Sequence, residues 1–325
     1  MLLEVKDLVK HFPLEKGFLS RFLPTKEVVH AVCHASFDIR EGETLGLVGE
    51  TGSGKTTLGR CILRLIEPTS GSIIYRGKDL CTLSKAEMKK LRAELQIIFQ
   101  DPFSSLNPRE TAARIIGRPM EIHGMSSGSD LREKVIEILR SVGLEEVHAD
   151  RYPHEFSGGQ RQRIAVARAL SVNPKFIVAD EPLSALDVSV QAQILNLLRD
   201  LQRERQLTYL FISHDLSVVK YMSNRLAVMY LGKIVELGPT DKVFKEPIHP
   251  YTRVLLSSIP IPDPKTRLTV VPVKGEVDLP SPVSPPPGCR FHTRCPSAKG
   301  ECSAVEPRLV ERSSGHLVAC HMNVN

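Results

Sequence analysis

A short glycine-rich loop between an apolar strand and a helix is the feature of this chain that most restricts its fold. The loop spans Gly49–Thr56 and follows the apolar segment Leu45–Val48. Glycines let successive backbone N–H groups turn toward one point, and the positive end of the following helix adds to their attraction for anions. The pattern therefore predicts a strand, a loop that binds phosphate groups, and a helix over Lys55–Ile66.

The side chains of this loop predict a particular ligand. Lys55 is expected to reach the β- and γ-phosphates of ATP, and Thr56 is expected to bind Mg²⁺ through its hydroxyl. A Gly/Ser-rich turn that binds nothing is the alternative, but the strand before the loop and an acidic strand later in the chain favour the nucleotide site. The predicted nucleotide-binding residues of this stretch are Gly49, Glu50, Thr51, Gly52, Ser53, Gly54, Lys55, Thr56 and Thr57.

The acidic strand leads into two neighbouring carboxylates. Phe176–Ala179 is an apolar run of strand length, and Asp180 and Glu181 follow it directly. We expect Asp180 to hold the Mg²⁺ shell through water, and Glu181 to orient or deprotonate the water that attacks the nucleotide. The alternative interpretation of Glu181 is a solvated loop charge.

A second glycine-containing loop predicts a second anion site. Ser157–Arg161 reads Ser-Gly-Gly-Gln-Arg and precedes a helical stretch over Gln162–Leu170. A serine hydroxyl and backbone N–H groups at the start of a helix attract anions. An ordinary helix cap would use the same residues. However, one nucleotide rarely needs two phosphate sites in one chain, so the second loop requires an explanation.

The order of these motifs resembles that of the ATP-binding cassette (ABC) ATPases, the motor subunits of membrane transporters. The resemblance covers about Met1–Thr252. It implies a P-loop NTPase core and a dimer of such subunits. In that dimer the second loop of one subunit faces the γ-phosphate held by the other. The residues that the resemblance assigns to this contact are Ser157, Gly158, Gly159 and Gln160.

The same resemblance assigns roles to residues outside the two loops. It implies that Gln100 senses the γ-phosphate and Mg²⁺, that His214 contacts the γ-phosphate, and that Ser184–Asp187 crosses the dimer interface. Phe12 lies where an aromatic ring stacks on adenine, although plain packing would also explain it. The implied catalytic residues are Glu181, His214 and Gln100, and the implied Mg²⁺ ligands are Thr56, Gln100 and Asp180.

Two domains are predicted from the pattern along the chain. Short apolar strands alternate with helical stretches over residues 1–255, which predicts an α/β nucleotide-binding domain with a mostly parallel sheet. Residues 103–160 lack strong strand signals and are expected to form an inserted helical subdomain. Residues 256–325 form a proline-rich, cysteine-containing C-terminal extension, and nine prolines lie within residues 260–287. Such a stretch favours extended backbone that wraps a surface or links domains.

Charge and hydropathy restrict the location and the partners. The net charge of +6 comes from Lys and Arg residues that are interleaved with Asp and Glu, so we expect no nucleic-acid partner. No apolar run approaches the roughly 18 residues that span a bilayer, and the N-terminus lacks the pattern of a signal peptide. We expect a peripheral protein at the cytoplasmic face of the cell membrane, attached through other subunits.

Several segments resemble the ATPase subunits of bacterial oligopeptide/dipeptide importers, and the F-type subunits of dipeptide transporters most of all. This resemblance extends over nearly the whole chain and implies a second, non-identical ATPase subunit, two transmembrane permeases and an extracytoplasmic peptide-binding protein. It also implies that residues 102–120 receive a permease helix. A nickel importer of the same family remains open, as does a soluble ABC ATPase that acts on nucleic acid or ribosomes. The segments are Gln100–Pro108, Tyr152–Ser157, His249–Thr252 and Pro285–Cys289.

Four of the seven cysteines gather near the C-terminus, at Cys289, Cys295, Cys302 and Cys320. Disulfides are disfavoured in the cytosol, so four thiols in a short segment suggest a metal centre that ties it down. The absence of Cys-x-x-Cys pairs argues against structural zinc, and thiolate ligation suits a 4Fe–4S cluster, which the resemblance also implies. Zinc, free thiols and a redox or iron sensor remain open. His292, His316 and His321 are expected to be bystanders, and Cys33, Cys61 and Cys81 to be buried small apolar residues.

Overall fold

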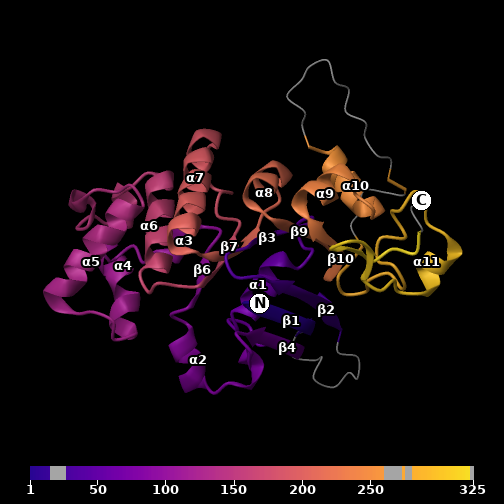
Figure 1. The fold of residues 1–325 in the computed structure, drawn as a ribbon, viewed down its shortest axis with the longest axis horizontal. Helices are drawn as coiled ribbons and strands as arrows, with labels where there is room; N and C mark the ends of the chain where they lie inside the picture. The colour runs from indigo at the N-terminus through magenta and orange to yellow at the C-terminus, as the bar shows by residue number, and fades with distance from the viewer. Residues whose placement is uncertain (15–26, 260–272, 275–279, 323–325) are drawn as a thin grey trace, which may run out of the picture. The chain divides into compact units, whose positions relative to one another are not determined.

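The computed structural model describes residues 1–14, 27–259, 273–274 and 280–322 (Figure 1). These residues form two compact units. Most of the proline-rich stretch 260–287 lies outside the described residues. The predicted domain boundary near residue 255 stays a prediction. The first unit comprises Met1–Asp38, Leu45–Cys81 and Ser213–Asn325, and the second comprises Ile39–Thr44 and Thr82–Ile212.

The first unit contains a four-stranded antiparallel sheet that the sequence did not predict. Its strand order is β2 (Val28–Ile39), β1 (Leu3–Pro13), β4 (Ser70–Tyr75) and β5 (Lys78–Asp79). Buried and exposed residues alternate along much of β2, so only one face of this sheet is covered. Because a half-covered strand lacks a continuous apolar run, its sequence signal is weaker than that of a fully buried strand.

A second group of strands in the first unit carries the glycine-rich loop. The predicted strand before the loop is β3 (Thr44–Val48), which is buried throughout and pairs in parallel with β9 (Arg225–Tyr230). A tight turn joins β9 to β10 (Lys233–Pro239), which pairs antiparallel with β9. On the other side of β10 lies β12 (His316–Val318), followed by β11 (Val310–Ser313). The C-terminal extension therefore contributes two strands to the sheet of the first unit.

The helices of the first unit are short. Helix α1 (Lys55–Ile62) follows the glycine-rich loop but ends four residues before the predicted Ile66. Arg64 adopts a left-handed conformation with φ 51°, which no α-helix can continue, and this explains the early end. The remaining helices of this unit are α8 (Leu216–Met222), α9 (Thr240–Lys245), α10 (Pro250–Ser257) and α11 (Gly300–Ala304).

The second unit is built on three parallel strands in the order β8 (Thr208–Ile212), β7 (Phe176–Asp180) and β6 (Leu95–Ile98). Strands β7 and β8 are buried at every position, as their unbroken apolar sequences predict. Parallel strands place their carboxyl ends at one edge, so residues that follow β6 and β7 lie near each other. The predicted α/β fold with mostly parallel strands around the glycine-rich loop and the acidic strand is confirmed.

Helices make up the rest of the second unit. The stretch predicted as a helical subdomain, 103–160, is described throughout and consists of helices and turns. Its main helices are α4 (Ala112–Ile122) and α5 (Gly128–Ser141), which pack on each other and on α6 (Gly158–Leu170). The others in this unit are α2 (Lys85–Leu91), α3 (Pro102–Ser105) and α7 (Val188–Arg205).

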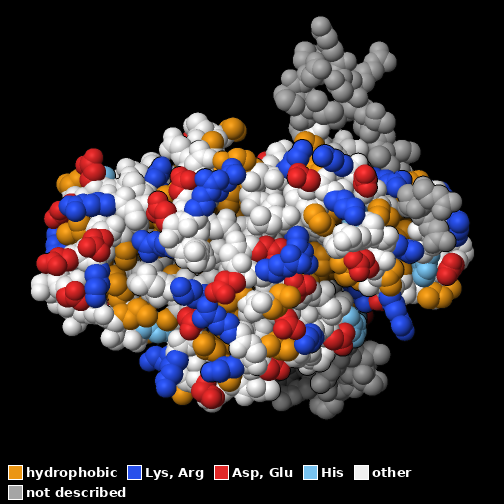
Figure 2. Space-filling view, viewed as in Figure 1, with side chains coloured by type: hydrophobic (Ala, Val, Ile, Leu, Met, Phe, Trp, Pro, Cys, Tyr) orange, Lys and Arg blue, Asp and Glu red, His pale blue; other side chains and the backbone are white. Residues whose placement is uncertain are grey.

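The molecular surface carries mixed charge. On the face drawn in Figure 2, Lys and Arg side chains are interspersed with Asp and Glu, as the interleaved sequence predicts. Among the described residues, no helix combines the length and the apolarity that crossing a bilayer requires.

Candidate nucleotide-binding motifs and cysteine centre

The loop between β3 and α1 holds its lysine in a fixed position. Lys55 is only 5% exposed, and its Nζ donates hydrogen bonds to the carbonyl oxygens of Gly49 at 2.8 Å and Glu50 at 3.1 Å. Burying an ammonium group is costly unless its N–H groups are bonded, and the loop's own carbonyls meet that need. The loop therefore presents a localised positive charge, which is the chemistry that binding of a triphosphate requires.

Two of the loop glycines are required by close backbone approaches. A Cβ atom on Gly54 would lie 2.1 Å from the carbonyl oxygen of Ala31 in β2, and Gly54 has φ 103°. A Cβ on Gly49 would lie 2.1 Å from the carbonyl oxygen of Met229 in β9. The loop thus packs directly on the backbone of β2 and β9, so its shape is set before any ligand binds.

Glu50 anchors the loop to the C-terminal part of the first unit. Its backbone N–H donates to the Tyr251 hydroxyl at 2.8 Å, and its carboxylate pairs with Arg294 at 3.0 Å. Sequence reasoning missed both partners. Tyr251 belongs to a segment that family resemblance identified without giving it a role. Arg294 lies 244 positions from Glu50, so no local pattern could have linked them.

Phe12 is half-buried near the end of β1, with the Lys10 ammonium 4.8 Å from the centroid of its ring. The exposed part of the ring is available for stacking. Its assignment to adenine stays a prediction.

The two carboxylates after the acidic strand differ in environment. Asp180 is the last residue of β7 and is 1% exposed, whereas Glu181 is half-buried. Glu181 has φ 47°, a left-handed conformation that is unfavourable for glutamate, and its N–H donates to the carbonyl of Ile212 at 3.0 Å. Such backbone strain gathers at functional sites, where it fixes the direction of a side chain.

Gln100 and Glu181 meet in the second unit. Gln100 lies two residues beyond β6 and Glu181 one residue beyond β7, the neighbouring strand. The Gln100 amide Nε2 donates to Glu181 Oε2 at 2.9 Å. The structure thus brings together two of the three residues predicted as catalytic, although they are 81 positions apart.

Ser157 caps helix α6, as the alternative interpretation of an ordinary helix cap expects, and the helix begins at Gly158, four residues before the predicted Gln162. The Ser157 hydroxyl accepts from the backbone N–H of Gln160 at 3.3 Å, and the Gln160 side chain accepts from the N–H of Ser157 at 3.0 Å. The next two glycines differ in surroundings. A Cβ on Gly159 would lie 2.5 Å from Val190 Cγ1, whereas one on Gly158 would first meet Leu186 Cδ2 at 3.5 Å, an ordinary contact distance.

His214 and the segment Ser184–Asp187 lie at the surface. The His214 side chain is exposed after β8, and Asp215 behind it caps α8 by accepting from the N–H of Ser217 at 2.8 Å. Asp187 likewise caps α7. Val188 follows and is 83% exposed. The contact of His214 with the γ-phosphate and the place of Ser184–Asp187 in a dimer interface stay predictions.

The four C-terminal cysteines line one small cavity of the first unit, although they are spread over more than thirty positions. Cys295, Cys302 and Cys320 are buried, Cys289 is half-buried, and none forms a disulfide. The Cys289 N–H donates to the Cys302 carbonyl at 2.8 Å. Burial, with a smaller contribution from the nearby cysteines, raises the pKa of the Cys289 thiol to about 11. Burial also raises the pKa of Cys295 and Cys320, so a bound cation would be needed to hold these groups as thiolates at neutral pH.

A histidine that sequence reasoning did not consider also lines this cavity. His249 is 1% exposed, and its Nδ1 accepts from the backbone N–H of Tyr251 at 3.1 Å. Its proton must therefore lie on Nε2, which is buried without a hydrogen-bond partner among the described residues. Burial lowers the pKa of His249 to about 4, so the ring is neutral.

The three histidines predicted to be bystanders all bond to protein groups. His292 donates to the Cys289 carbonyl at 2.8 Å, and His321 donates to the Val305 carbonyl at 2.8 Å. His316 is fully buried and pairs with Glu236 at 2.7 Å. Of the other cysteines, Cys33 and Cys61 are buried as predicted, whereas Cys81 is half-buried, so the prediction of burial is wrong for Cys81.

Comparison with known proteins relates the nucleotide-binding motifs and the C-terminal extension to one family. A family model described as "ABC transporter" matches residues 32–184, and one described as "Oligopeptide/dipeptide transporter, C-terminal region" matches residues 235–302. The chain is 55% identical to the "Putative oligopeptide transport ATP-binding protein YkfD" of Bacillus subtilis (strain 168), over 100% of this chain and 96% of that protein. It is 50% identical to the oligopeptide transport ATP-binding protein AppF of the same strain, over 99% of this chain and 97% of AppF.

Solved structures agree with this relationship. A dimeric ATP-binding cassette bound to ADP and Pi in a post-hydrolysis state superposes with a TM-score of 0.64 at 29% identity, covering 74% of this chain and 99% of the other. A Clostridium perfringens cassette from the cbiONQ transporter complex gives the same TM-score at 28% identity, covering 75% of this chain and 91% of the other. The motif order, the fold and the full-length similarity show that this chain belongs to the ABC transporter ATPases, as an ATP-binding protein of the oligopeptide/dipeptide transporter family.

Proposed function

We propose that this chain hydrolyses ATP to energise the import of di- and oligopeptides by a membrane ABC transporter. The observation that carries the proposal is similarity over the full length of proteins named for oligopeptide transport, including the C-terminal region that gives the second family model its name. Transport of nickel by the same machinery is the competing substrate assignment. The peptide itself is expected to meet the permeases and the binding protein and not this subunit.

Within this function each predicted nucleotide residue has a role. Lys55 binds the β- and γ-phosphates and Thr56 binds Mg²⁺, while Asp180 holds the Mg²⁺ shell through water. Mg²⁺ supplies charge neutralisation for the phosphates. The buried Lys55 supports this assignment, because the loop carbonyls that accept its hydrogen bonds hold the ammonium group in place. Glu181 orients the attacking water, and the Gln100 amide holds the Glu181 carboxylate in position.

The second subunit is expected to complete each ATP site. We propose that the Ser157 cap and the N–H groups at the start of α6 bind the γ-phosphate of ATP held by the opposite ATPase subunit. Ser184–Asp187, followed by the exposed Val188, is proposed to lie in this interface. The partner subunit is proposed to be a non-identical relative of this chain.

The permease contact is proposed to lie at residues 102–120. Phe103 is 60% exposed, and the Arg161 guanidinium lies 3.8 Å from the centroid of its ring. An exposed aromatic ring held by a cation is suited to receive an apolar helix end, because it is presented without having to move. Arg161 also belongs to the Ser157–Arg161 loop, so the permease contact and the phosphate-binding cap share one ion–ring pair. We expect the Arg161–Phe103 pair to couple ATP binding at the cap to movement of the permease.

Purification and transport together test the proposed function. A tagged chain is expected to bring two permeases and a related ATPase subunit from solubilised membranes. Vesicles reconstituted with these subunits and the binding protein are expected to accumulate labelled dipeptide only with ATP. Accumulation of ⁶³Ni²⁺ without peptide, or purification with ribosomes in place of permeases, would overturn the assignment.

We propose further that Cys289, Cys295, Cys302 and Cys320 hold a 4Fe–4S cluster. The orphaned His249 Nε2–H supports this, because a cluster sulfur in the cavity would accept its hydrogen bond. A bound cluster would anchor the C-terminal extension, which has little hydrophobic core of its own. It would also supply a group that can gain or lose one electron.

Anaerobic purification is expected to yield about four iron and four sulfide per chain. Cys302→Ser and Cys289→Ser are each expected to lose most of this iron, because a serine hydroxyl is a poor iron ligand in a thiolate site. Cys81→Ser, which removes a half-buried thiol outside the cavity, is the matched control and should keep it. Zinc in place of iron, or full iron loading in both tail variants, would contradict the cluster.

A further inference from the structure

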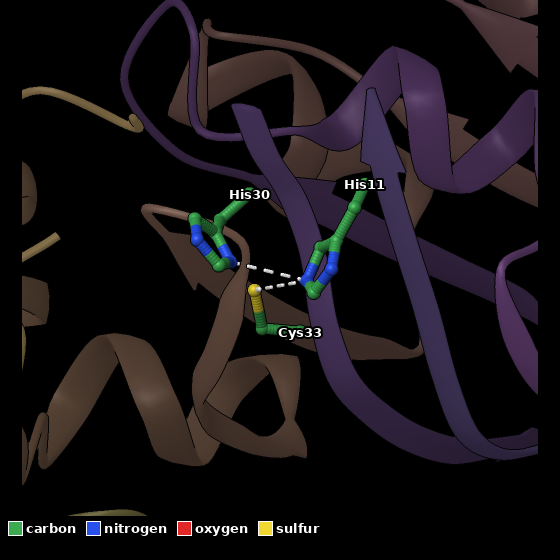
Figure 3. A group of neighbouring side chains, drawn as sticks. All are labelled: His11, His30 and Cys33. Atoms are coloured by element: carbon green, nitrogen blue, oxygen red, sulfur yellow. Dashed lines mark hydrogen bonds between the residues drawn. The ribbon is translucent and has the colours of Figure 1, made fainter. Parts of the chain in front are cut away.

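Two histidines and a cysteine converge on the antiparallel sheet of the first unit. His11 lies on β1, and His30 and Cys33 lie on β2 (Figure 3). His30 Nδ1 is 3.1 Å from His11 Nε2, and Cys33 Sγ is 4.0 Å from the same nitrogen. The three potential ligand atoms all lie within 4.8 Å of one another. These residues have no part in the proposed peptide-import mechanism.

The spacing of the three atoms suits one transition-metal ion. Zinc bonds of about 2.0–2.1 Å to nitrogen and 2.3 Å to sulfur place tetrahedral ligand atoms about 3.3 Å apart for two nitrogens and about 3.6 Å apart for nitrogen and sulfur. The observed separations of 3.1 Å and 4.0 Å differ from these by a few tenths of an ångström. Small rotations of the side chains would close that difference.

A hydrogen bond between two neutral imidazoles is the simpler explanation of part of this cluster. One ring would donate and the other accept, which accounts for the 3.1 Å contact. It does not account for the thiol that approaches the same His11 nitrogen, because that nitrogen is already used in the imidazole pair. A shared cation uses all three atoms at once.

The electrostatic surroundings select the kind of cation. The Arg290 guanidinium acts on both histidines and would repel a cation, and a metal-bound Cys33 thiolate would offset this repulsion. Hard ions such as Mg²⁺ prefer oxygen ligands and would gain nothing here. The donor set instead suits zinc and neighbouring d-block ions, for which imidazole and thiolate are preferred ligands.

This cluster is built into the framework of the nucleotide loop. The Cys33 N–H donates to the Gly232 carbonyl at 2.8 Å, and the Gly232 N–H donates to the Ser53 carbonyl of the loop at 2.8 Å. His11 directly precedes Phe12.

We propose that His11, His30 and Cys33 form a zinc site with three protein ligands and a fourth position for water, separate from the four-cysteine centre. Its ion links β1 to β2 beside the nucleotide loop.

Cobalt absorption tests this site in the full-length chain. Co²⁺ added to reduced, metal-stripped protein is expected to give a thiolate-to-cobalt charge-transfer band and the strong visible bands of tetrahedral cobalt. The part of the cobalt absorption that comes from this site is expected to disappear in Cys33→Ser and in His11→Gln. It is expected to persist in Cys302→Ser, which disrupts the four-cysteine centre. Added zinc should displace the cobalt and remove the absorption.

His34→Asn is the matched control. It removes an imidazole one position from Cys33 that is exposed and pairs with Asp7 instead, and asparagine tolerates the left-handed φ of 55° at this position. The site signal should remain in His34→Asn. Circular dichroism identifies folded variants, and two ligand variants are used so that loss of fold in one leaves the other informative. A cobalt spectrum that is the same in wild type, Cys33→Ser and His11→Gln would overturn the proposal and leave the imidazole pair as the explanation.

Discussion

Glu181→Gln is expected to reduce steady-state ATP hydrolysis by roughly 10²- to 10⁴-fold, which is the usual contribution of a general base. Glutamine has the shape of glutamate but cannot take a proton from water. Its amide oxygen can still accept the hydrogen bond that Gln100 donates to Glu181 Oε2 at 2.9 Å. Both side chains meet the same backbone strain at φ 47°, so stability should change little. The measurement is phosphate release by the assembled transporter, together with ATP affinity.

ATP affinity is expected to be unchanged in this variant, because Lys55 and its loop bonds are unaltered. Asp200→Asn is the matched control: it removes an exposed carboxylate from α7 in the same unit and should leave hydrolysis intact. Turnover by Glu181→Gln that equals wild type would remove Glu181 from its proposed role. Loss of ATP binding in Glu181→Gln would instead assign the residue to binding.

The parts of the fold that sequence reasoning predicted share a physical property. Strands β3, β7 and β8 are buried at every position, so most of their residues are apolar and consecutive. Helix α7 has an apolar stripe at helical spacing, and α6 begins at a Ser-Gly-Gly cap. In each case the signal lies within about twenty consecutive residues. The glycine-rich loop was predictable for the same reason.

Features that depend on distant contacts were not predictable. The antiparallel pairing of β1 with β4 joins residues about seventy positions apart, and nothing in either strand specifies the partner. The Arg294–Glu50 ion pair and the approach of His249 to the cysteine cavity arise only when the C-terminal strands pair with β10. His11, His30 and Cys33 are individually ordinary residues, and only the packing of β1 on β2 brings their ligand atoms together.

The convergence of the four tail cysteines lies between these cases. Their clustering in the sequence predicted a shared centre, and the structure places all four around one cavity. Composition could not identify the occupant, because thiolates bind zinc and iron alike. The 4Fe–4S cluster therefore stays a proposal, which the buried Nε2–H of His249 supports.

Gly158→Asp is expected to reduce ATP hydrolysis by the assembled transporter by at least about 100-fold. The proposed cap binds the γ-phosphate of the opposite subunit, and a like charge placed against it costs several kcal/mol. The fold should tolerate the change, because a Cβ at Gly158 first meets Leu186 at 3.5 Å. ATP binding by the isolated chain should be unaffected, since its own phosphates are bound by the Lys55 loop.

Stability separates this effect from damage to the helix. Gly158 is the first residue of α6, where replacing glycine reduces the entropy of the unfolded chain and a carboxylate interacts favourably with the helix dipole. Gly158→Asp should therefore melt at or slightly above the temperature of wild type while its turnover falls. Gly158→Asn is the matched neutral variant, and it should retain more activity than Gly158→Asp because it adds similar bulk without charge. Wild-type turnover in Gly158→Asp would show that no phosphate approaches this helix start, since a stabilised helix with an added negative charge could not otherwise leave hydrolysis unchanged.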